Sequence, residues 1–169
     1  PEAMVIRELV RTAPARVQEM AAKPHYLAKP PPAASLADLK TAARSCESCP
    51  LFAKATQTVF GEGNPEAALM IVGEQPGDEE DLSGKPFIGP AGAILASALS
   101  EAKIARGDIY LTNAVKHYKW EPSNRPSKPR LHKTASAMEI SACRPWLESE
   151  IEKVKPRIIL ALGRSAGLS

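Results

Sequence analysis

Three short apolar runs constrain the fold of this chain more than any other feature. They are residues 67–72, followed by Gly73, residues 108–112, and residues 156–162, followed by Gly163. Apolar runs of this length are typical of strands that are buried on both faces of a parallel sheet. Helical patterns lie between the runs, and the alternation of strands with helices predicts an α/β fold. We expect a three-layer sandwich with a central, mainly parallel sheet that is covered on both faces.

The helices between the strands are expected at residues 89–103 and 138–154. In the first of them, helical spacing places on one face Ala91, Ile94, Leu95, Ala98 and Leu99. Ser136 followed by Glu139 marks the start of the second. Ser35 followed by Asp38 marks an earlier short helix, because a serine and an acidic residue three positions apart satisfy free backbone N–H groups.

The region before Ser35 differs in composition from the rest of the chain. Residues 5–22 carry apolar side chains at helical spacing, whereas residues 23–34 contain four prolines. This proline density predicts an extended linker without a core of its own. We therefore expect a tail and linker at residues 1–34, which could join a fused upstream domain, and a compact domain at residues 35–169. A three-strand α/β domain is small, so its C-terminal part is expected to be missing.

Functional residues are expected at the carboxyl ends of the strands, where open α/β sheets bind ligands. Gly73-Glu-Gln-Pro-Gly77 is a sharp turn after the first strand, and residues 74–90 are expected to form a long loop. Within it, Glu79 and Glu80 are expected to belong to a solvated turn. Phe87 could pack in the core or offer a flat apolar surface for stacking.

Three cysteines and one histidine indicate a metal site. Cys46 and Cys49 form a C-x-x-C pair in a loop before the first strand, whereas a thioredoxin-like pair follows a strand at the start of a helix. With Cys143 they supply three thiolates, which need a fourth ligand for a four-iron cluster or a tetrahedral zinc. His117 is the candidate because it directly follows the second strand. The alternative is a free buried Cys143 and a surface His117.

Four segments, taken in order, resemble the iron–sulfur (family 4) uracil-DNA glycosylases. They are Val59-Phe-Gly-Glu-Gly-Asn-Pro65, Gly73-Glu-Gln-Pro-Gly-Asp-Glu-Glu-Asp81, Gly84-Lys-Pro-Phe-Ile-Gly-Pro-Ala-Gly92 and Tyr110-Leu-Thr-Asn-Ala-Val-Lys116. The resemblance covers residues 36–167 and implies a uracil-DNA glycosylase-like fold with a [4Fe-4S] cluster. The implied cluster ligands are Cys46, Cys49, His117 and Cys143. The family usually has cysteine at the position of His117, and it carries a His-Pro-Ser motif near its C-terminus that this chain does not contain.

The same resemblance implies how uracil would be bound. Phe87 would stack on the base, and Asn113 would read its Watson–Crick edge. An asparagine side chain offers an acceptor for N3–H and a donor for O4, which fits uracil and not cytosine. The alternatives are a core Phe87 and an Asn113 that caps a turn.

Residues 117–135 are expected to form a basic, proline-bearing loop that contacts DNA phosphates and unstacked bases. The side chains expected to contact DNA are Lys116, Lys119, Arg125, Lys128, Arg130 and Lys133. Within this loop, residues 128–134 resemble the segment that marks the UdgX-like branch of the family. The Gly-Glu-Gln-Pro-Gly turn and His117 agree with that branch.

Membership of the UdgX-like branch implies that His132 bonds covalently to C1′ of the sugar once uracil has left. A neutral imidazole near C1′ outcompetes water by proximity, and the new bond has no good leaving group. Glu74 is expected to orient His132 or accept its proton, and Gln75 to hold the uracil or the histidine. Asp78 and Asp81 are expected to steady this network. Without the family, His132 is more simply a solvated histidine near a phosphate.

The sequence therefore predicts a uracil-DNA glycosylase that becomes linked to its uracil-containing DNA, single-stranded DNA included. Two alternatives are a conventional glycosylase that releases an abasic site and a non-catalytic iron–sulfur module that binds nucleic acid. The net charge of +3 is far from that of a histone-like polycation. No run of about 18 apolar residues is present, so we expect no membrane partner. No secretory signal is present, so we expect the protein in the bacterial cytoplasm or nucleoid. We also expect a monomer.

Overall fold

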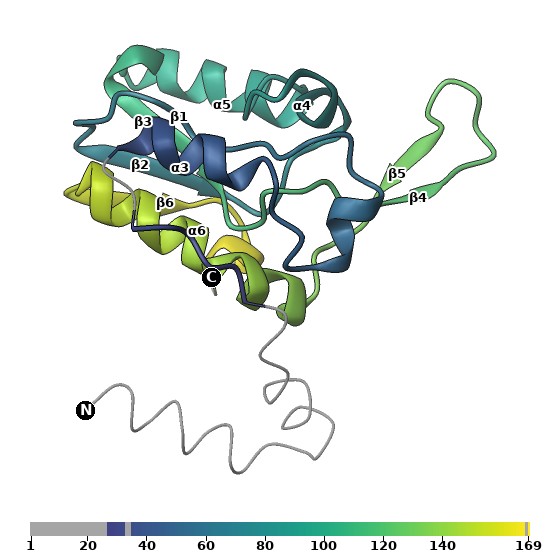
Figure 1. The fold of residues 1–169 in the computed structure, drawn as a ribbon. Coiled ribbons are helices and arrows are strands. Elements are labelled where there is room, and N and C mark those ends of the chain that lie inside the picture. The colour runs from purple at the N-terminus through teal and green to yellow at the C-terminus, as the bar shows by residue number, and fades with distance from the viewer. Residues whose placement is uncertain (1–26, 33–34, 168) are drawn as a thin grey trace, which may run out of the picture.

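A four-strand sheet forms the centre of the molecule in the computed structural model, which describes residues 27–32, 35–167 and 169 (Figure 1). The strand order is β1-β3-β2-β6, with β1 at Glu62–Gly63, β2 at Leu69–Gly73, β3 at Ile109–Asn113 and β6 at Ile158–Ala161. β2 is parallel to β3 and to β6, whereas β1 pairs antiparallel with β3. The three parallel strands lie within the predicted apolar runs or one residue beyond them, which confirms the mainly parallel sheet.

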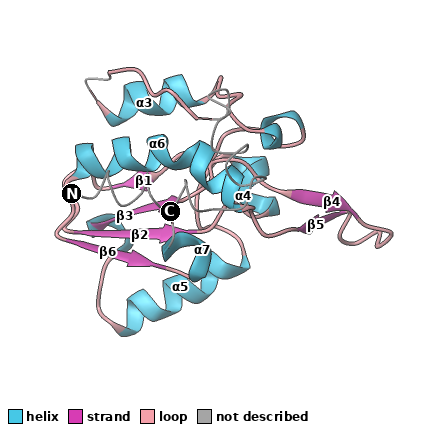
Figure 2. Cartoon of the chain, turned by 90° about the horizontal axis from the view of Figure 1, so that it is seen from below, coloured by secondary structure: helices cyan, strands magenta, loops and turns pink. Residues whose placement is uncertain are grey.

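Helices cover both faces of β2 because side chains along a strand point alternately to opposite sides. Ile71 packs with Leu95 of α5 (Pro90–Glu101). Met70 and Val72 face the other side, where they pack with Leu147 of α6 (Ala137–Val154). The third layer is completed by α3 (Leu36–Ala43), which packs on α6. Figures 1 and 2 show the sheet between α5 on one side and α6 on the other, so the predicted three-layer sandwich is confirmed.

Both predicted helix starts have the expected caps. The Ser35 hydroxyl accepts a hydrogen bond from Asp38 N–H while the Asp38 carboxylate accepts from Ser35 N–H. Ser136 and Glu139 make the same reciprocal pair at the start of α6. Replacing such a cap with alanine typically costs about 1 kcal/mol, so these two short sequences fix where the helices begin.

The third apolar run was predicted to be a buried strand, but the strand that it forms is exposed. Ile158, Ile159 and Leu160 of β6 are 63%, 47% and 45% exposed. Within the described part of the chain, β6 pairs with β2 alone and lies at the edge of the sheet. The short helix α7 (Arg164–Gly167) follows it. The apolar pattern correctly indicated a strand, but burial depends on a covering layer that the described residues do not supply.

The buried face of α5 is narrower than its sequence suggested. Gly92, Leu95 and Leu99 are buried, whereas Ile94 is 74% exposed and Ala91 and Ala98 are exposed. A single helix over a sheet buries one stripe, and these three positions with spacings of three and four residues form it. Of the residues expected to share one face, only Leu95 and Leu99 therefore belong to the buried stripe.

Two segments expected to be loops contain regular structure. Within residues 74–90 lies the short helix α4 (Asp78–Ser83), which ends at Gly84 with φ of 75°. Within residues 117–135, β4 (Trp120–Pro122) and β5 (Arg130–His132) pair as an antiparallel hairpin. The hairpin forms a sheet separate from the central one and projects from the body of the molecule (Figures 1 and 2).

The packed part of the molecule begins before Ser35. Ala28 is 4% exposed in the core that also contains Leu39 and Trp146, and its N–H donates to the carbonyl of Ala142 at 2.8 Å. Ala28, which lies within the expected linker, therefore packs on α6. The helix expected at residues 5–22 lies outside the described residues. Among the described helices, none has the length and apolar character that crossing a membrane requires.

Candidate functional site

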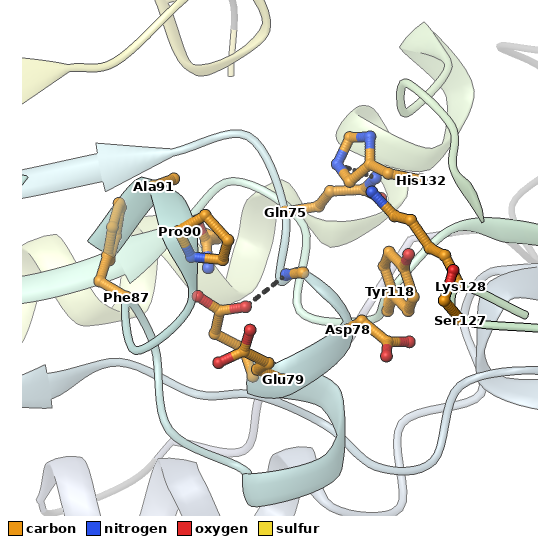
Figure 3. Close-up of a pocket in the computed structure, with 13 residues that line it drawn as sticks. Gln75, Asp78, Glu79, Phe87, Pro90, Ala91, Tyr118, Ser127, Lys128 and His132 are labelled. Carbon is orange, nitrogen blue, oxygen red and sulfur yellow. Dashed lines mark hydrogen bonds between the residues drawn. The ribbon is translucent and has the colours of Figure 1, made fainter. Parts of the chain in front are cut away.

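A pocket of about 410 Å³ lies at the carboxyl ends of β2 and β3, where the sequence placed the functional residues (Figure 3). Gln75 follows β2, Asn113 ends β3, and the start of α4 contributes Gly77 and Asp78. The remaining lining residues are Glu79, Glu80, Phe87, Pro90, Ala91, Tyr118, Ser127, Lys128 and His132. The pocket therefore brings together Phe87, Asn113, Gln75 and His132, which come from four separate segments of the chain.

Phe87 and Asn113 are held by a backbone with little room for change. Phe87 has φ of 55°, a left-handed backbone conformation that residues other than glycine rarely adopt. A Cβ at Gly92 would lie 2.1 Å from the carbonyl oxygen of Phe87, so only glycine fits at position 92. A Cβ at Gly73 would lie 2.4 Å from Asn113 Oδ1 and 2.8 Å from Phe87 Cζ. Glycine at position 73 thus allows the amide and the ring to approach each other across the end of β2.

Glu80 shapes the same wall of the pocket and is not part of a solvated turn. It is 6% exposed, and its carboxylate accepts hydrogen bonds from the N–H groups of Gly77, Ile88 and Gly89 at 3.1, 3.1 and 2.9 Å. The prediction of a solvated residue is correct for Glu79, which is exposed. It is wrong for Glu80 because three backbone donors replace its water. This carboxylate ties the start of α4 to the segment that carries Phe87.

Arg130 anchors the hairpin to α4. Its Nε lies 2.5 Å from Asp78 Oδ1, and its Nη1 lies 2.6 Å from Asp81 Oδ2. Its guanidinium also lies over the rings of Tyr118 and Trp120, at 5.4 and 5.6 Å from their centroids. Asp81 is fully buried. The two aspartates, which were expected to steady the network around His132, thus pair with Arg130, a residue expected to contact DNA.

His132 lies at the rim of the pocket beside Gln75 (Figure 3). Gln75 Nε2 is 2.8 Å from His132 Nε2 and 2.7 Å from the carbonyl of Lys133, while Gln75 Oε1 accepts from Lys119 N–H at 3.0 Å. An amide nitrogen only donates, so His132 Nε2 accepts and carries the lone pair. The imidazole is then neutral, with its proton on Nδ1.

Glu74 lies at the base of the hairpin and does not share that contact. Its Oε1 accepts a hydrogen bond from Ala135 N–H at 2.8 Å, three residues after His132. Gln75, rather than Glu74, is therefore the residue of the Gly-Glu-Gln-Pro-Gly turn that contacts the imidazole in this conformation.

The residues expected to contact DNA differ widely in exposure. Arg125 and Lys128 are exposed in the turn of the hairpin. Lys119 and Lys133 pair with Glu139 and Glu121, each at 2.9 Å. Lys116 is 1% exposed and pairs with the buried Glu150. The assignment of Lys116 to the DNA-contacting set is therefore wrong, because its ammonium has no path to a phosphate.

The three cysteines surround one end of the core. Cys49 and Cys143 are buried in it, and Cys46 packs against it. Trp146 Nε1 donates to Cys46 Sγ and Lys116 N–H donates to Cys143 Sγ, each at 3.2 Å. Backbone N–H groups of Leu51 and Phe52 reach Cys49. Each sulfur thus has an N–H donor, and such a hydrogen bond favours the thiolate form. In the free thiols, burial raises the pKa of Cys143 to about 12, so binding a metal must displace a proton.

His117, the expected fourth ligand, has one ring nitrogen without a proton. Its pKa is lowered to about 4 by burial, so the ring is neutral near pH 7. The Thr58 hydroxyl donates to the carbonyl of Ala43 at 2.9 Å, and therefore accepts from His117 Nε2 at 3.2 Å. This leaves the lone pair on Nδ1. Within the described ranges, no three potential ligands surround a single point closely enough for one metal ion. The ligands of a four-iron cluster bind different iron atoms, so a cluster does not require that arrangement.

Sequence reasoning missed Tyr118, Glu150 and the anchoring role of Arg130. Tyr118 is 1% exposed and its ring centroid lies 5.9 Å from that of His132. Glu150 had a signal: it lies seven residues after Cys143, so helical spacing places a carboxylate on the apolar stripe of α6. No comparable signal existed for Arg130, because its partners lie about 50 residues away in the sequence.

This fold and pocket correspond to a known class of protein. Residues 60–168 match the model of the Uracil DNA glycosylase superfamily, and the chain belongs to that superfamily. It is 41% identical over 120 residues to a type-4 uracil-DNA glycosylase of Pyrobaculum aerophilum, an alignment that covers 71% of this chain and 56% of that protein. It is 39% identical over 123 residues to the type-4 enzyme of Thermotoga maritima, covering 73% of this chain and 59% of that protein. It is 37% identical over 132 residues to that of Archaeoglobus fulgidus, covering 78% and 61%.

The chain thus spans between half and two thirds of the length of these curated relatives. Their similarity confirms the resemblance to family 4 that the four sequence segments indicated. It does not separate the UdgX-like branch from the rest of the family, so the role of His132 depends on the geometry of the pocket.

Proposed function

We propose that this protein excises uracil from DNA and becomes covalently linked to the sugar through His132. The contact between Gln75 and His132 carries this proposal, because it holds a neutral imidazole at the rim of a pocket that contains Phe87 and Asn113. The base would stack on the Phe87 ring, and the Asn113 amide would pair with uracil N3–H and O4. The pocket would then leave C1′ of the flipped nucleotide near the imidazole.

The chemical step breaks the bond between C1′ and N1 of uracil, whose electron pair leaves with the base. The sugar becomes an oxocarbenium-like cation with an electrophilic C1′. The lone pair on His132 Nε2 then forms the new bond to C1′, after exchanging its contact with Gln75 for the sugar. The ring is then positively charged, and loss of the Nδ1 proton makes it neutral. The uracil anion takes up a proton. We assign to Glu74 the stabilisation of positive charge here, since its carboxylate is held beside the hairpin at Ala135.

We also propose that Cys46, Cys49, Cys143 and His117 hold a [4Fe-4S] cluster with a structural role. The cluster would connect the loop before β2, the end of β3 and α6, and so fix the segment from which the hairpin begins. The exposed Arg125 and Lys128 at the turn of the hairpin would contact DNA phosphates. The chemistry at C1′ uses none of the cluster ligands.

A denaturing gel with a uracil-containing single-stranded oligonucleotide tests the proposed reaction. We expect a slower-migrating band that survives heat and detergent, together with release of one uracil per adduct. A matched oligonucleotide with thymine in place of uracil should give no band, since we assign the pocket to uracil. Free abasic DNA without a shifted band would instead show a turnover glycosylase, and unchanged DNA that still binds the protein would show a binding module.

The close approach of Asn113 and Phe87 to Gly73 gives a second prediction. A Gly73→Ala substitution should lower the rate of uracil excision by about 10²-fold, because the new methyl group displaces the amide and the ring from their positions. The expected readout is the single-turnover rate at saturating protein. Gly107→Ala is the matched control, since a Cβ there meets nothing within 4 Å. An unchanged rate in Gly73→Ala would contradict the assignment of this pair to the base.

A further inference from the structure

A lysine and a glutamate form a fully buried ion pair beneath the pocket. Lys116 follows β3 and is 1% exposed, and Glu150 lies on α6 with no exposed surface. Their Nζ and Oε2 atoms are 2.5 Å apart. Burying two charges is costly, and apolar residues of similar size often serve stability as well or better. The contacts of this pair therefore indicate that it fixes the positions of neighbouring groups more than it adds stability.

All three protons of the Lys116 ammonium have defined acceptors. They are Glu150 Oε2, Thr112 Oγ1 at 2.8 Å, and the carbonyl oxygen of Asn113 at 2.6 Å. The Phe60 ring covers the ammonium at 5.6 Å from its centroid. The contact with Asn113 matters for the pocket, because the peptide group that it fixes belongs to the residue assigned to the edge of uracil.

Glu150 is itself fixed from three sides. Its Oε1 accepts from Gly61 N–H at 2.9 Å and from the Tyr110 hydroxyl at 3.0 Å, and Thr112 donates to its carboxylate at 2.9 Å. A Cβ at Gly61 would lie 2.3 Å from Oε1, so this position admits no larger residue without displacing the carboxylate. The carboxylate is thus a rigid acceptor for Lys116.

α6 holds Lys116 at both ends. The backbone N–H of Lys116 donates to Cys143 Sγ, and its ammonium binds Glu150. Cys143 and Glu150 are seven residues apart on α6, which is about two turns, so they lie on the same face of the helix. Beside Lys116, Ala114 N–H and Val115 N–H donate to the carbonyls of Gly73 and Glu74. One residue therefore links α6 to the segment that carries Asn113.

We propose that Lys116, held by Glu150, is a positioning residue that fixes Asn113 for the recognition of uracil. The proposal rests on the function proposed above only in assigning the base to Asn113. Removing the ammonium frees the Asn113 carbonyl, so the peptide group can rotate and the side-chain amide loses its direction. The charge of Lys116 then serves base recognition from inside the protein, without contacting DNA.

Two variants separate positioning from simple stability. Lys116→Met leaves a buried carboxylate unpaired and should lower the melting temperature. The double variant Lys116→Met with Glu150→Gln removes both charges and keeps an oxygen for Gly61 N–H and Tyr110, so we expect the melting temperature to recover. Uracil excision should stay about 10²-fold slower in both variants. Lys153→Met, at an exposed lysine on α6, is the matched control and should behave as the wild type.

Hydrogen exchange gives a readout that does not depend on activity. The amides of Ala114 and Val115 should exchange at least tenfold faster in the double variant than in the wild type, while those of β2 stay protected. Recovery of the excision rate together with the melting temperature would overturn the positioning role, as would unchanged exchange at these two amides. A wild-type protein that does not excise uracil would contradict the proposed function, and the exchange measurement would still test the link to Asn113.

Discussion

Replacing His132 with serine is expected to abolish the covalent adduct while leaving uracil excision in place. The variant keeps Phe87 and Asn113, so the base still binds and leaves, but no imidazole competes with water for C1′. The shifted band on a denaturing gel should fall by more than about 10²-fold. Abasic DNA, detected by cleavage with alkali, should appear in its place and accumulate over several turnovers.

The matched control for this substitution is Lys133→Ser. Lys133 neighbours His132, and its ammonium pairs with Glu121 on the hairpin, so the control removes a nearby side chain without touching the imidazole. It should still form the adduct to the full wild-type yield at saturating DNA, even where loss of one cation expected to contact DNA weakens binding. An adduct that persists in His132→Ser would show that another nucleophile attacks C1′, and the assignment of His132 would then be wrong.

Loss of a cluster cysteine is expected to have the second largest effect. The protein as isolated without oxygen should be brown, with absorbance near 400 nm (roughly, for iron bound by thiolates). Cys46→Ala should remove this colour and lower the free energy of unfolding by about 4 kcal/mol or more, because a tightly bound group stabilises only the folded state. Absorbance, iron content and thermal unfolding are the measurements.

Ser48→Ala is the control for this second substitution, since Ser48 lies between the two cysteines of the pair. It should keep both the colour and the stability. A colourless wild-type protein that contains one zinc ion per chain would contradict the cluster and favour a tetrahedral site. The N–H donors that reach all three sulfurs are compatible with either metal, so the metal analysis is decisive.

Local sequence patterns predicted the elements of this fold well but not their burial. The caps at Ser35 and Ser136 involve residues only three positions apart, so they can be predicted from the local sequence. The exposure of Ile158 depends on which element lies over β6, and the packing of Ala28 depends on a contact with Ala142. Neither is encoded in the neighbouring residues. The helix α4 was missed because six residues are too few to show a helical period.

The predicted pocket residues lie close together where the fold dictates proximity. Gln75 follows β2 and Asn113 ends β3, and these strands are parallel neighbours, so the topology alone brings the two residues together. The mistakes concern charges. Lys116 and Arg130 were taken as DNA contacts from the composition of their loop, but each has carboxylates from distant segments as partners. Composition shows how many cations a loop carries and does not show which of them a buried acid neutralises.

The separation of the hairpin from the central sheet bears on how such chemistry could be acquired. β4 and β5 pair only with each other in the described structure, so the stretch from Trp120 to His132 can be inserted or removed without shifting the register of any strand in the core. The residues that we assign to the base lie at the ends of the core strands and in the loop before α5, whereas His132 lies on a hairpin with its own anchor at Arg130. We therefore expect that the hairpin can be moved, together with its anchoring contacts, onto another protein of the same fold.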